Sequence, residues 1–299
     1  MDDRIRTRTV NLAVAALALL LGGCSSLPAP RPFPAPGNPP AGESPARAAA
    51  ARFTTSTTRV MLHGQPLELH LAVPDQPAAD APIVLYASGD GGWFGAAVDM
   101  FHQLARAGSP VVGFSSRSFL KIQRPHGGLV NAAQLAADYD AIVTHARAAF
   151  HLGDATRVVL TGWSRGAAFS VLAASEPAAR GYLAGIIAIG LGAGEDLGAT
   201  SDDDATDDGE LDDAGRNWRF DNYATIARLG PLACAVIQAS HDSYLPAATA
   251  RRLFGPDTDR RRLYAIDAKN HRFTGGKAAF DAALLDALRW IAAQPERNS

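Results

Sequence analysis

The pattern with the clearest chemical meaning is a glycine-x-serine-x-glycine motif, Gly162–Gly166, with Ser164 at its centre. It follows the apolar run Arg157–Thr161 and precedes an alanine-rich stretch of helical character. A strand that turns sharply into a helix holds such a serine in a strained conformation, and the flanking glycines let the two backbones pass closely. The helix N-terminus then favours negative charge that develops on a bound carbonyl group. The motif predicts Ser164 as the nucleophile of an acyl transfer.

A serine presented in this way needs an acid that comes later in the chain, at the carboxyl end of a following strand. Asp242 occupies such a place, because it lies just beyond the apolar run Cys234–Ala239. Three other aspartates near the next strand are alternatives: Asp257, Asp259 and Asp267. The sequence favours Asp242 as the orienting acid.

The proton acceptor is expected to be a histidine, since an imidazole titrates near neutral pH and can both take up and return the serine proton. His271 follows the last predicted strand and precedes the last predicted helix, the usual place of the imidazole in this arrangement. His241 is a competitor, but it comes before Asp242, whereas the expected order is serine, acid, histidine. Sequence order therefore predicts His271 as the base.

Two backbone N–H groups are expected to hold the oxyanion that forms on an attacked carbonyl. One belongs to Arg165, directly after the serine, and the other to the loop after the third predicted strand. That loop, Ser88–Trp93, contains three glycines that let the backbone turn inward, and Asp90 is the predicted second donor. The residues predicted to line the substrate pocket are Gly89, Gly91, Trp93 and Trp163.

From Phe53 onward, short apolar and β-branched runs alternate with helical patterns, which is typical of a largely parallel sheet covered by helices. The predicted strands are Arg59–Leu62, Leu67–Val73, Ile83–Ala87, Val111–Ser115, Arg157–Thr161, Gly185–Gly190, Cys234–Ala239 and Leu263–Ile266. The gap between the first two is short enough for an antiparallel hairpin. Amphipathic helices are predicted at Asn131–Phe150 and Ala278–Ala293. We expect the α/β-hydrolase fold, with a mostly parallel eight-stranded sheet and helices on both faces.

Composition argues against several other functions. The 28 Lys and Arg and 30 Asp and Glu give a formal charge of -2, without the basic excess that nucleic-acid binding needs. The histidines form no pair at the helical spacing of metal ligands, so no metal and no organic cofactor is predicted. Cys234 lies in an apolar predicted strand and is expected to be a buried, unreactive thiol.

The N-terminus resembles an export signal. Arginines precede the apolar run Val10–Leu21, which is too short for a membrane-spanning helix, and a signal peptide is predicted over residues 1–23. The run Leu21–Cys24 resembles the bacterial lipoprotein box, in which the cysteine is acylated and becomes the first residue of the mature chain. A plain signal peptide and an uncleaved anchor are the alternatives.

Residues 24–52 are dominated by proline and alanine and are predicted to be a spacer, followed by one folded domain over residues 53–299. The expected location is the periplasm, with Cys24 attached to a membrane, and Ser25 favours the outer membrane. A later segment, Ser201–Asp213, carries eight acidic residues and is predicted to be an exposed loop. A lid whose negative charge attracts a cationic substrate is the alternative.

With these motifs in place, the chain resembles the AcvB/VirJ family of bacterial periplasmic proteins. The resemblance spans about Ala81 to Ala293 and rests on the loop Ser88–Trp93, the Gly162–Gly166 motif and the loop around His271, supported by the Val111–Phe114 strand. It implies hydrolysis of the aminoacyl ester of lysyl-phosphatidylglycerol, and related proteins are linked to the secretion of virulence substrates. One departure stands out, because the family pattern continues as Gly-Ala-Asp where this chain has Gly166-Ala167-Ala168.

Together these features predict a periplasmic, lipid-anchored serine hydrolase that cleaves an ester, with an aminoacyl phospholipid as the implied substrate. Another carboxylesterase or a thioesterase is the alternative among enzymes. A non-catalytic periplasmic adaptor linked to secretion and virulence is the alternative outside that class. The expected partners are the ester substrate and the membrane that holds Cys24, without nucleic acid.

Overall fold

A computed structural model describes residues 52–77, 80–123, 131–196 and 219–295 of the chain. The predicted signal peptide, the lipidation site Cys24, the predicted linker up to residue 51 and the acidic segment 201–213 lie outside these residues. Within the described ranges, no helix combines the length and the apolar character needed to cross a bilayer.

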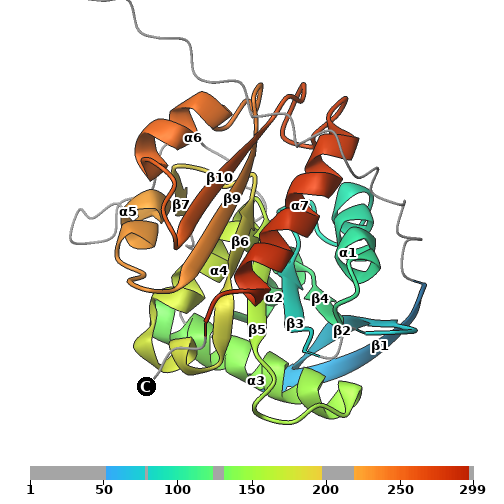
Figure 1. The fold of residues 1–299 in the computed structure, drawn as a ribbon. Helices are drawn as coiled ribbons and strands as arrows, with labels where there is room; N and C mark the ends of the chain where they lie inside the picture. The colour runs from blue at the N-terminus through green and yellow to red at the C-terminus, as the bar shows by residue number, and fades with distance from the viewer. Residues whose placement is uncertain (1–51, 78–79, 124–130, 197–218, 296–299) are drawn as a thin grey trace, which may run out of the picture. The chain divides into compact units, whose positions relative to one another are not determined.

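An eight-stranded sheet forms the centre of the described structure (Figure 1). Its strand order is β1-β2-β4-β3-β5-β6-β9-β10. The β1–β2 and β2–β4 pairs are antiparallel, and all the remaining pairs are parallel. The prediction of a mostly parallel sheet of eight strands is therefore confirmed. The strands are β1 Phe53–Leu62, β2 Gln65–Pro74, β3 Ile83–Ala87, β4 Val111–Phe114, β5 Val158–Trp163, β6 Leu183–Ile189, β9 Ala233–Ala239 and β10 Arg261–Ile266.

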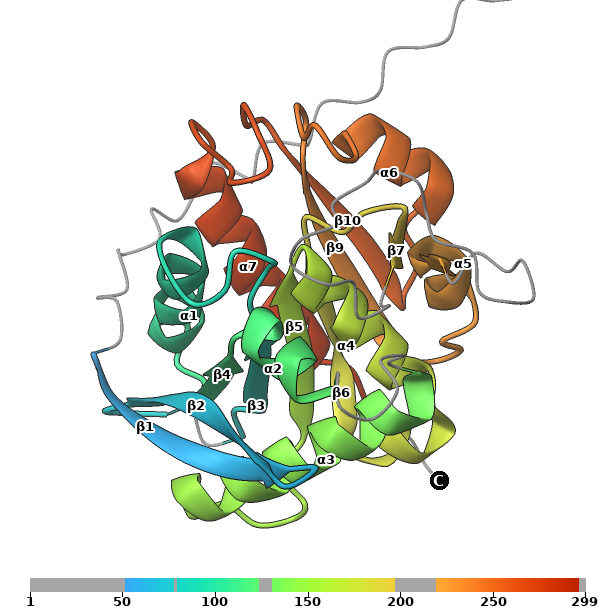
Figure 2. The ribbon, with the colours of Figure 1, turned by 180° about the vertical axis from the view of Figure 1, so that it is seen from behind.

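Helices cover both faces of the sheet, as predicted (Figures 1 and 2). α1 and α7 pack on one face, and α2, α3 and α4 pack on the other. The helices are α1 Ala96–Arg106, α2 Ser116–Gln123, α3 Ala132–Phe150, α4 Arg165–Ser175, α5 Asn222–Ala227, α6 Ala247–Phe254 and α7 Lys277–Ala292, with a short 3₁₀ turn at Pro177–Gly181.

A small two-stranded sheet, which the sequence did not predict, lies after β6. β7 (Gly194–Asp196) pairs antiparallel with β8 (Arg219–Asp221), and these two strands flank the segment 197–218 in the sequence. The first strand of the main sheet also differs from the prediction, since it begins at Phe53 instead of Arg59. Most side chains in its first half are exposed, so the apolar alternation that identifies a half-buried strand is absent there.

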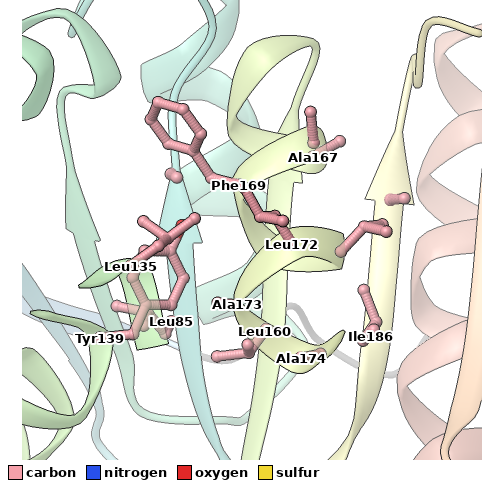
Figure 3. Packing of buried hydrophobic residues seen from close by; sticks show 14 of the residues in the cluster. Leu85, Leu135, Tyr139, Leu160, Ala167, Phe169, Leu172, Ala173, Ala174 and Ile186 are labelled. Carbon is pink, nitrogen blue, oxygen red and sulfur yellow. The ribbon is translucent and has the colours of Figure 1, made fainter. Parts of the chain in front are cut away.

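α4 is the most deeply buried helix around the serine motif (Figure 3). Its small residues let it approach the sheet closely, while Phe169 and Leu172 fill the space beside Leu85 and Leu160. Residues along β5 alternate between the two faces, with Val159 in the core layer under α1 and α7 and its neighbours under α4. The turn between β5 and α4 is therefore fixed by close packing on both sides.

Candidate active site

Ser164 lies at the sharp turn between β5 and α4. Its backbone angles, φ 57° and ψ -121°, are strained for a residue with a side chain. A Cβ atom at Gly162 would overlap the backbone of Gly166, and a Cβ atom at Gly166 would overlap the carbonyl oxygen of Ala87. The close approach predicted for these two glycines is thus present in the structure, and it presents the serine at the first turn of the helix.

His271 and Asp242 form a buried pair near this turn. The imidazole Nδ1 lies 2.7 Å from Oδ2 of Asp242, whose residue is only 1% exposed. The same oxygen accepts a hydrogen bond from Nε2 of Gln238 at 3.1 Å, and Oδ1 accepts one from the backbone N–H of Tyr244 at 2.9 Å. Gln238 Nε2 also donates to the carbonyl oxygen of Leu245 at 2.6 Å. The carboxylate is therefore held from three directions, and it determines how the imidazole is oriented.

The alternative acids and base lie elsewhere. Asp257 pairs with Arg251 and accepts a hydrogen bond from the backbone of Leu263. Asp259 and Asp267 are exposed, and so is His241. Of the groups that sequence order left open, Asp242 is the one that pairs with His271.

The His271 ring lies between two aromatic side chains. Its centroid is 5.4 Å from that of Trp163 and 4.9 Å from that of Tyr244. The indole Nε1 of Trp163 donates to the carbonyl oxygen of His271 at 3.3 Å. Gly190 leaves room for the ring, because a Cβ atom there would lie 2.7 Å from Cε1 of the imidazole. Trp163, Tyr244 and Gly190, together with Asp242, thus restrict the position of the imidazole.

The second imidazole nitrogen, Nε2, is buried and has no hydrogen-bond partner among the described residues, Ser164 included. Hydrogen bonds to a general base are often long before a substrate is bound and shorten only in the complex. Since Nδ1 is engaged by Asp242, Nε2 is the nitrogen left to accept a proton.

Ser164 and His271 line the same cavity, which has a volume of about 510 Å³. The loop after β3 contributes Gly89, Asp90 and Gly91 to its wall, and Trp163 also lines it. Phe94 and Tyr244 also line it, and they expose 66% and 75% of their surface. Two further charged residues, Glu195 and Arg272, complete the polar part of the lining.

Trp93, which the sequence predicts in the substrate pocket, is not among the residues that line this cavity. Its ring stacks on His70 with 4.1 Å between centroids and packs edge-on against Phe101 at 5.1 Å. Partial burial lowers the pKa of His70, and the carboxylate of Glu68 opposes this change. The indole packs against the α1 side of the core, and the adjacent Phe94 lines the cavity instead.

Asp90 and Arg165, the two predicted oxyanion donors, are joined through their side chains. Nε of Arg165 lies 2.8 Å from Oδ1 of Asp90 and 2.8 Å from Oε1 of Glu195. Neither backbone N–H group has an acceptor in the part of the chain that the structure describes. For Arg165 this follows from its place in the first turn of α4, where N–H groups have no partner within the helix.

Several residues of the site were not predicted from the sequence: Gln238, Gly190 and Glu195, and the cavity-lining residues Phe94, Tyr244 and Arg272. Gln238 could have been suspected, because it is the one polar residue in the apolar strand β9. Gly190 follows β6 without any motif that reveals its contact with His271. Glu195 gave no signal apart from its position shortly before an acidic stretch. Ala168, where the family pattern has an aspartate, lies in the apolar core around α4.

The remaining nucleophilic side chain of interest, Cys234, is buried in β9. Burial raises the pKa of its thiol to about 12, so the thiol is protonated at neutral pH. In the described ranges, no group of three or more His, Cys, Asp or Glu side chains is arranged to hold a metal ion.

The strand order, the helices on both faces and the serine turn after β5 define an α/β-hydrolase fold, and solved structures of hydrolases share it. Est1E from Butyrivibrio proteoclasticus matches with a TM-score of 0.55 and 16% identity over 80% of this chain and 99% of that chain. An α/β serine hydrolase homologue from Coxiella burnetii matches with a TM-score of 0.54 and 14% identity over 77% of this chain and 96% of that chain. A dienelactone hydrolase from Anabaena variabilis matches with a TM-score of 0.53 and 17% identity over 80% of this chain and 96% of that chain. At these identities the likeness shows the fold alone.

A family model described as bacterial virulence protein (VirJ) matches residues 80–181. This match confirms the resemblance over the glycine-rich loop and the serine motif, while Asp242 and His271 lie beyond the matched residues. No curated protein matches the chain.

Proposed function

We propose that this protein is a serine hydrolase that cleaves carboxylic esters, with Ser164 as nucleophile, His271 as base and Asp242 as orienting acid. The observation that carries the proposal is the position of Ser164 and His271 on one cavity, while a buried carboxylate engages the other imidazole nitrogen. A pair that served only stability would not need a serine in a strained conformation beside it. The fold shared with a dienelactone hydrolase and a serine hydrolase homologue supports the same class of reaction.

In the proposed first step, Nε2 of His271 takes the proton of Ser164 Oγ as this oxygen bonds to the ester carbonyl carbon. Asp242 keeps the proton of the imidazole on Nδ1 and stabilises the imidazolium that forms. The carbonyl oxygen becomes negative and is held by the N–H groups of Asp90 and Arg165. When this intermediate collapses, the bond to the alcohol oxygen breaks, and the imidazolium returns its proton to that oxygen.

The second half of the reaction repeats these steps with water. His271 takes a proton from a water molecule, whose oxygen attacks the acyl-enzyme carbonyl carbon. Collapse of the second tetrahedral intermediate breaks the bond to Ser164 Oγ and returns the proton to it. The products are an alcohol and a carboxylic acid, and the enzyme is regenerated.

For the substrate, we propose an aminoacyl ester of a phospholipid, such as lysyl-phosphatidylglycerol. The family resemblance supports it, and so does the chemistry of the cavity wall. Asp90 and Glu195 share the single guanidinium of Arg165, which leaves one net negative charge for the amine of an aminoacyl group, and Arg272 offers a cation to a phosphate. The exposed rings of Phe94 and Tyr244 suit the apolar part of a lipid. Attachment of Cys24 to a periplasmic membrane would bring the domain to such a substrate.

The test is hydrolysis by the purified protein without its lipid anchor. Wild type should release nitrophenol from a short-chain nitrophenyl ester, and Ser164→Ala should lose at least about 10³-fold of that rate. Incubation with lysyl- and alanyl-phosphatidylglycerol, followed by detection of the free amino acid, separates the aminoacyl-lipid hydrolase from another carboxylesterase. A fluorophosphonate should label wild type and leave Ser164→Ala unlabelled.

Full esterase activity in Ser164→Ala, or no activity of wild type on any ester, would refute the proposed reaction. Absence of fluorophosphonate labelling together with stable binding to a secretion-system protein would favour the adaptor function instead.

A further inference from the structure

Arg165 connects the two chain segments on either side of the serine turn. In the sheet, β5 lies between β3 and β6, and the carboxyl ends of these parallel strands meet at one edge. From the first residue of α4, the Arg165 guanidinium reaches Asp90 after β3 and Glu195 in β7, after β6. We call Asp90, Arg165 and Glu195 the charge bridge. One side chain thus links the segments that follow both neighbouring strands.

The segment on the β3 side has few other restraints. Between Gly89 and Gly92 the chain has one local backbone hydrogen bond of 3.0 Å, and Ser88 Oγ donates to the Gly89 carbonyl oxygen at 3.1 Å. Gly92 has a positive φ of 86°. Glycines have the largest conformational freedom, so such a loop samples many backbone positions unless a side chain fixes it. Asp90 supplies that side chain, and Arg165 is its one charged partner among the described residues.

The segment on the β6 side is better fixed. Glu195 belongs to the β7–β8 ladder, and its side chain is only 18% exposed, against 57% for Asp90. Arg165 is therefore oriented from the less exposed side by Glu195 and transmits this orientation to Asp90. The β7–β8 ladder thus restrains the glycine-rich loop through Arg165.

We propose that the charge bridge positions the oxyanion-stabilising N–H groups, with Arg165 and Glu195 acting through Asp90 on the glycine-rich loop. This role rests on the proposed function, because it concerns the same site and the same reaction. Asp90 and Arg165 each contribute a backbone N–H to the oxyanion, and their side-chain ion pair sets the distance between the two donors. An oxyanion donor that moves by a fraction of an ångström loses much of its effect, whereas a partly exposed ion pair adds little to folding.

The test uses variants that keep both N–H groups and remove one side chain. Asp90→Ala and Arg165→Met should each lower kcat on a nitrophenyl ester by about 10- to 100-fold with a nearly unchanged KM, less than the ~10²–10³-fold effect of deleting a donor. Affinity for a trifluoromethyl ketone, whose serine adduct carries an oxyanion, should fall in parallel. Asp90→Asn should recover part of the loss, because its amide oxygen is a neutral acceptor within reach of the Arg165 guanidinium.

The double variant Asp90→Ala/Arg165→Met should lose no more than the larger single loss, since both changes break the same pair. Asp286→Ala is the matched control, because it removes the surface ion pair with Arg262, neither residue of which lines the cavity, and its kcat should equal that of wild type. Fluorophosphonate titration counts the active sites in each sample, so that misfolded molecules do not enter kcat.

The proposed role of the charge bridge is refuted if Asp90→Ala keeps kcat per labelled site within about twofold of wild type, or if the substitution changes only KM. It is also refuted if the losses in kcat of the two single variants multiply in the double variant. A wild type that neither labels nor hydrolyses esters would refute the proposed function itself. The variants therefore test the role of the charge bridge, whereas wild type alone tests the proposed reaction.

Discussion

The two sides of the candidate active site are held in place by different means. On the acid side, Asp242 is buried and accepts hydrogen bonds from His271, Gln238 and the backbone of Tyr244. On the loop side, Asp90 is largely exposed and is fixed through the guanidinium of Arg165. The acid side is built from strand ends and interior hydrogen bonds, and the loop side depends on charges that contact solvent.

This difference sets how each side responds to change. The loss of an interior hydrogen bond costs much free energy, because a buried polar group that loses its partner has no water to replace it. Exposed ion pairs are weaker and are screened by salt. We therefore expect substitutions on the acid side to have larger effects, and changes of solution conditions to act mainly on the loop side.

The largest expected effect is that of Asp242→Asn. The amide fills the same space but cannot hold the imidazole with its proton on Nδ1, and kcat should fall by about 10⁴-fold. The measurement is ester hydrolysis together with thermal unfolding. A loss below about tenfold in a folded variant would show that the acid side is no more critical than the loop side.

Gly190→Ala is expected to have the next largest effect. The methyl group would lie 2.7 Å from Cε1 of His271, and the φ of 59° adds backbone strain. Displacement of the imidazole should lower kcat by about 10²-fold, as expected for a misplaced catalytic group. Gly230→Ala is the control, because its φ of 64° brings similar strain while a Cβ there meets nothing within 4 Å. Equal losses in the two variants would argue against contact with the imidazole as the cause.

Gln238→Leu should act more weakly, through the acid. It removes the donor to Asp242 Oδ2 and leaves the Leu245 carbonyl oxygen without its partner, which costs about 1–3 kcal/mol of stability. We expect kcat to fall by roughly tenfold, a part of the loss expected when the orienting carboxylate is changed. Thr161→Val also removes a buried hydrogen bond, to the carbonyl oxygen of Ile187, and should lower stability while leaving kcat unchanged. If both variants lose stability and neither loses kcat, Gln238 is only structural.

The smallest effect concerns salt and belongs to the loop side. Raising NaCl to about 0.5 M, where the Debye length falls to a few ångströms, should lower wild-type kcat on a neutral ester by about twofold. Asp90→Ala should show no such dependence, because the ion pair is already broken. The same salt dependence in both proteins would mean that the charge bridge does not control the rate.

The fold and the main candidate residues could be predicted because their signals are local. The glycines around Ser164 are required where two backbone segments pass closely, and apolar runs mark the strands that precede Asp242 and His271. Chain order then leaves few choices for the acid and the base. The structure brings these residues together at the ends of β5, β9 and β10.

The residues that were missed or misplaced depend on contacts between distant segments. Trp93 and Phe94 are neighbours in one loop, and composition cannot tell which ring enters the core and which borders the cavity. Glu195 matters through Arg165, 30 positions away, and Gly190 through the ring of His271. Such roles arise only once the sheet has aligned the strand ends.

The buried thiol of Cys234 has a practical consequence. It lies in β9, between β6 and β10, and is 1% exposed, so an alkylating reagent can reach it only when that part of the sheet opens. In a chain that lacks Cys24, the alkylation rate of this single thiol would measure how often the interior opens, independently of any turnover.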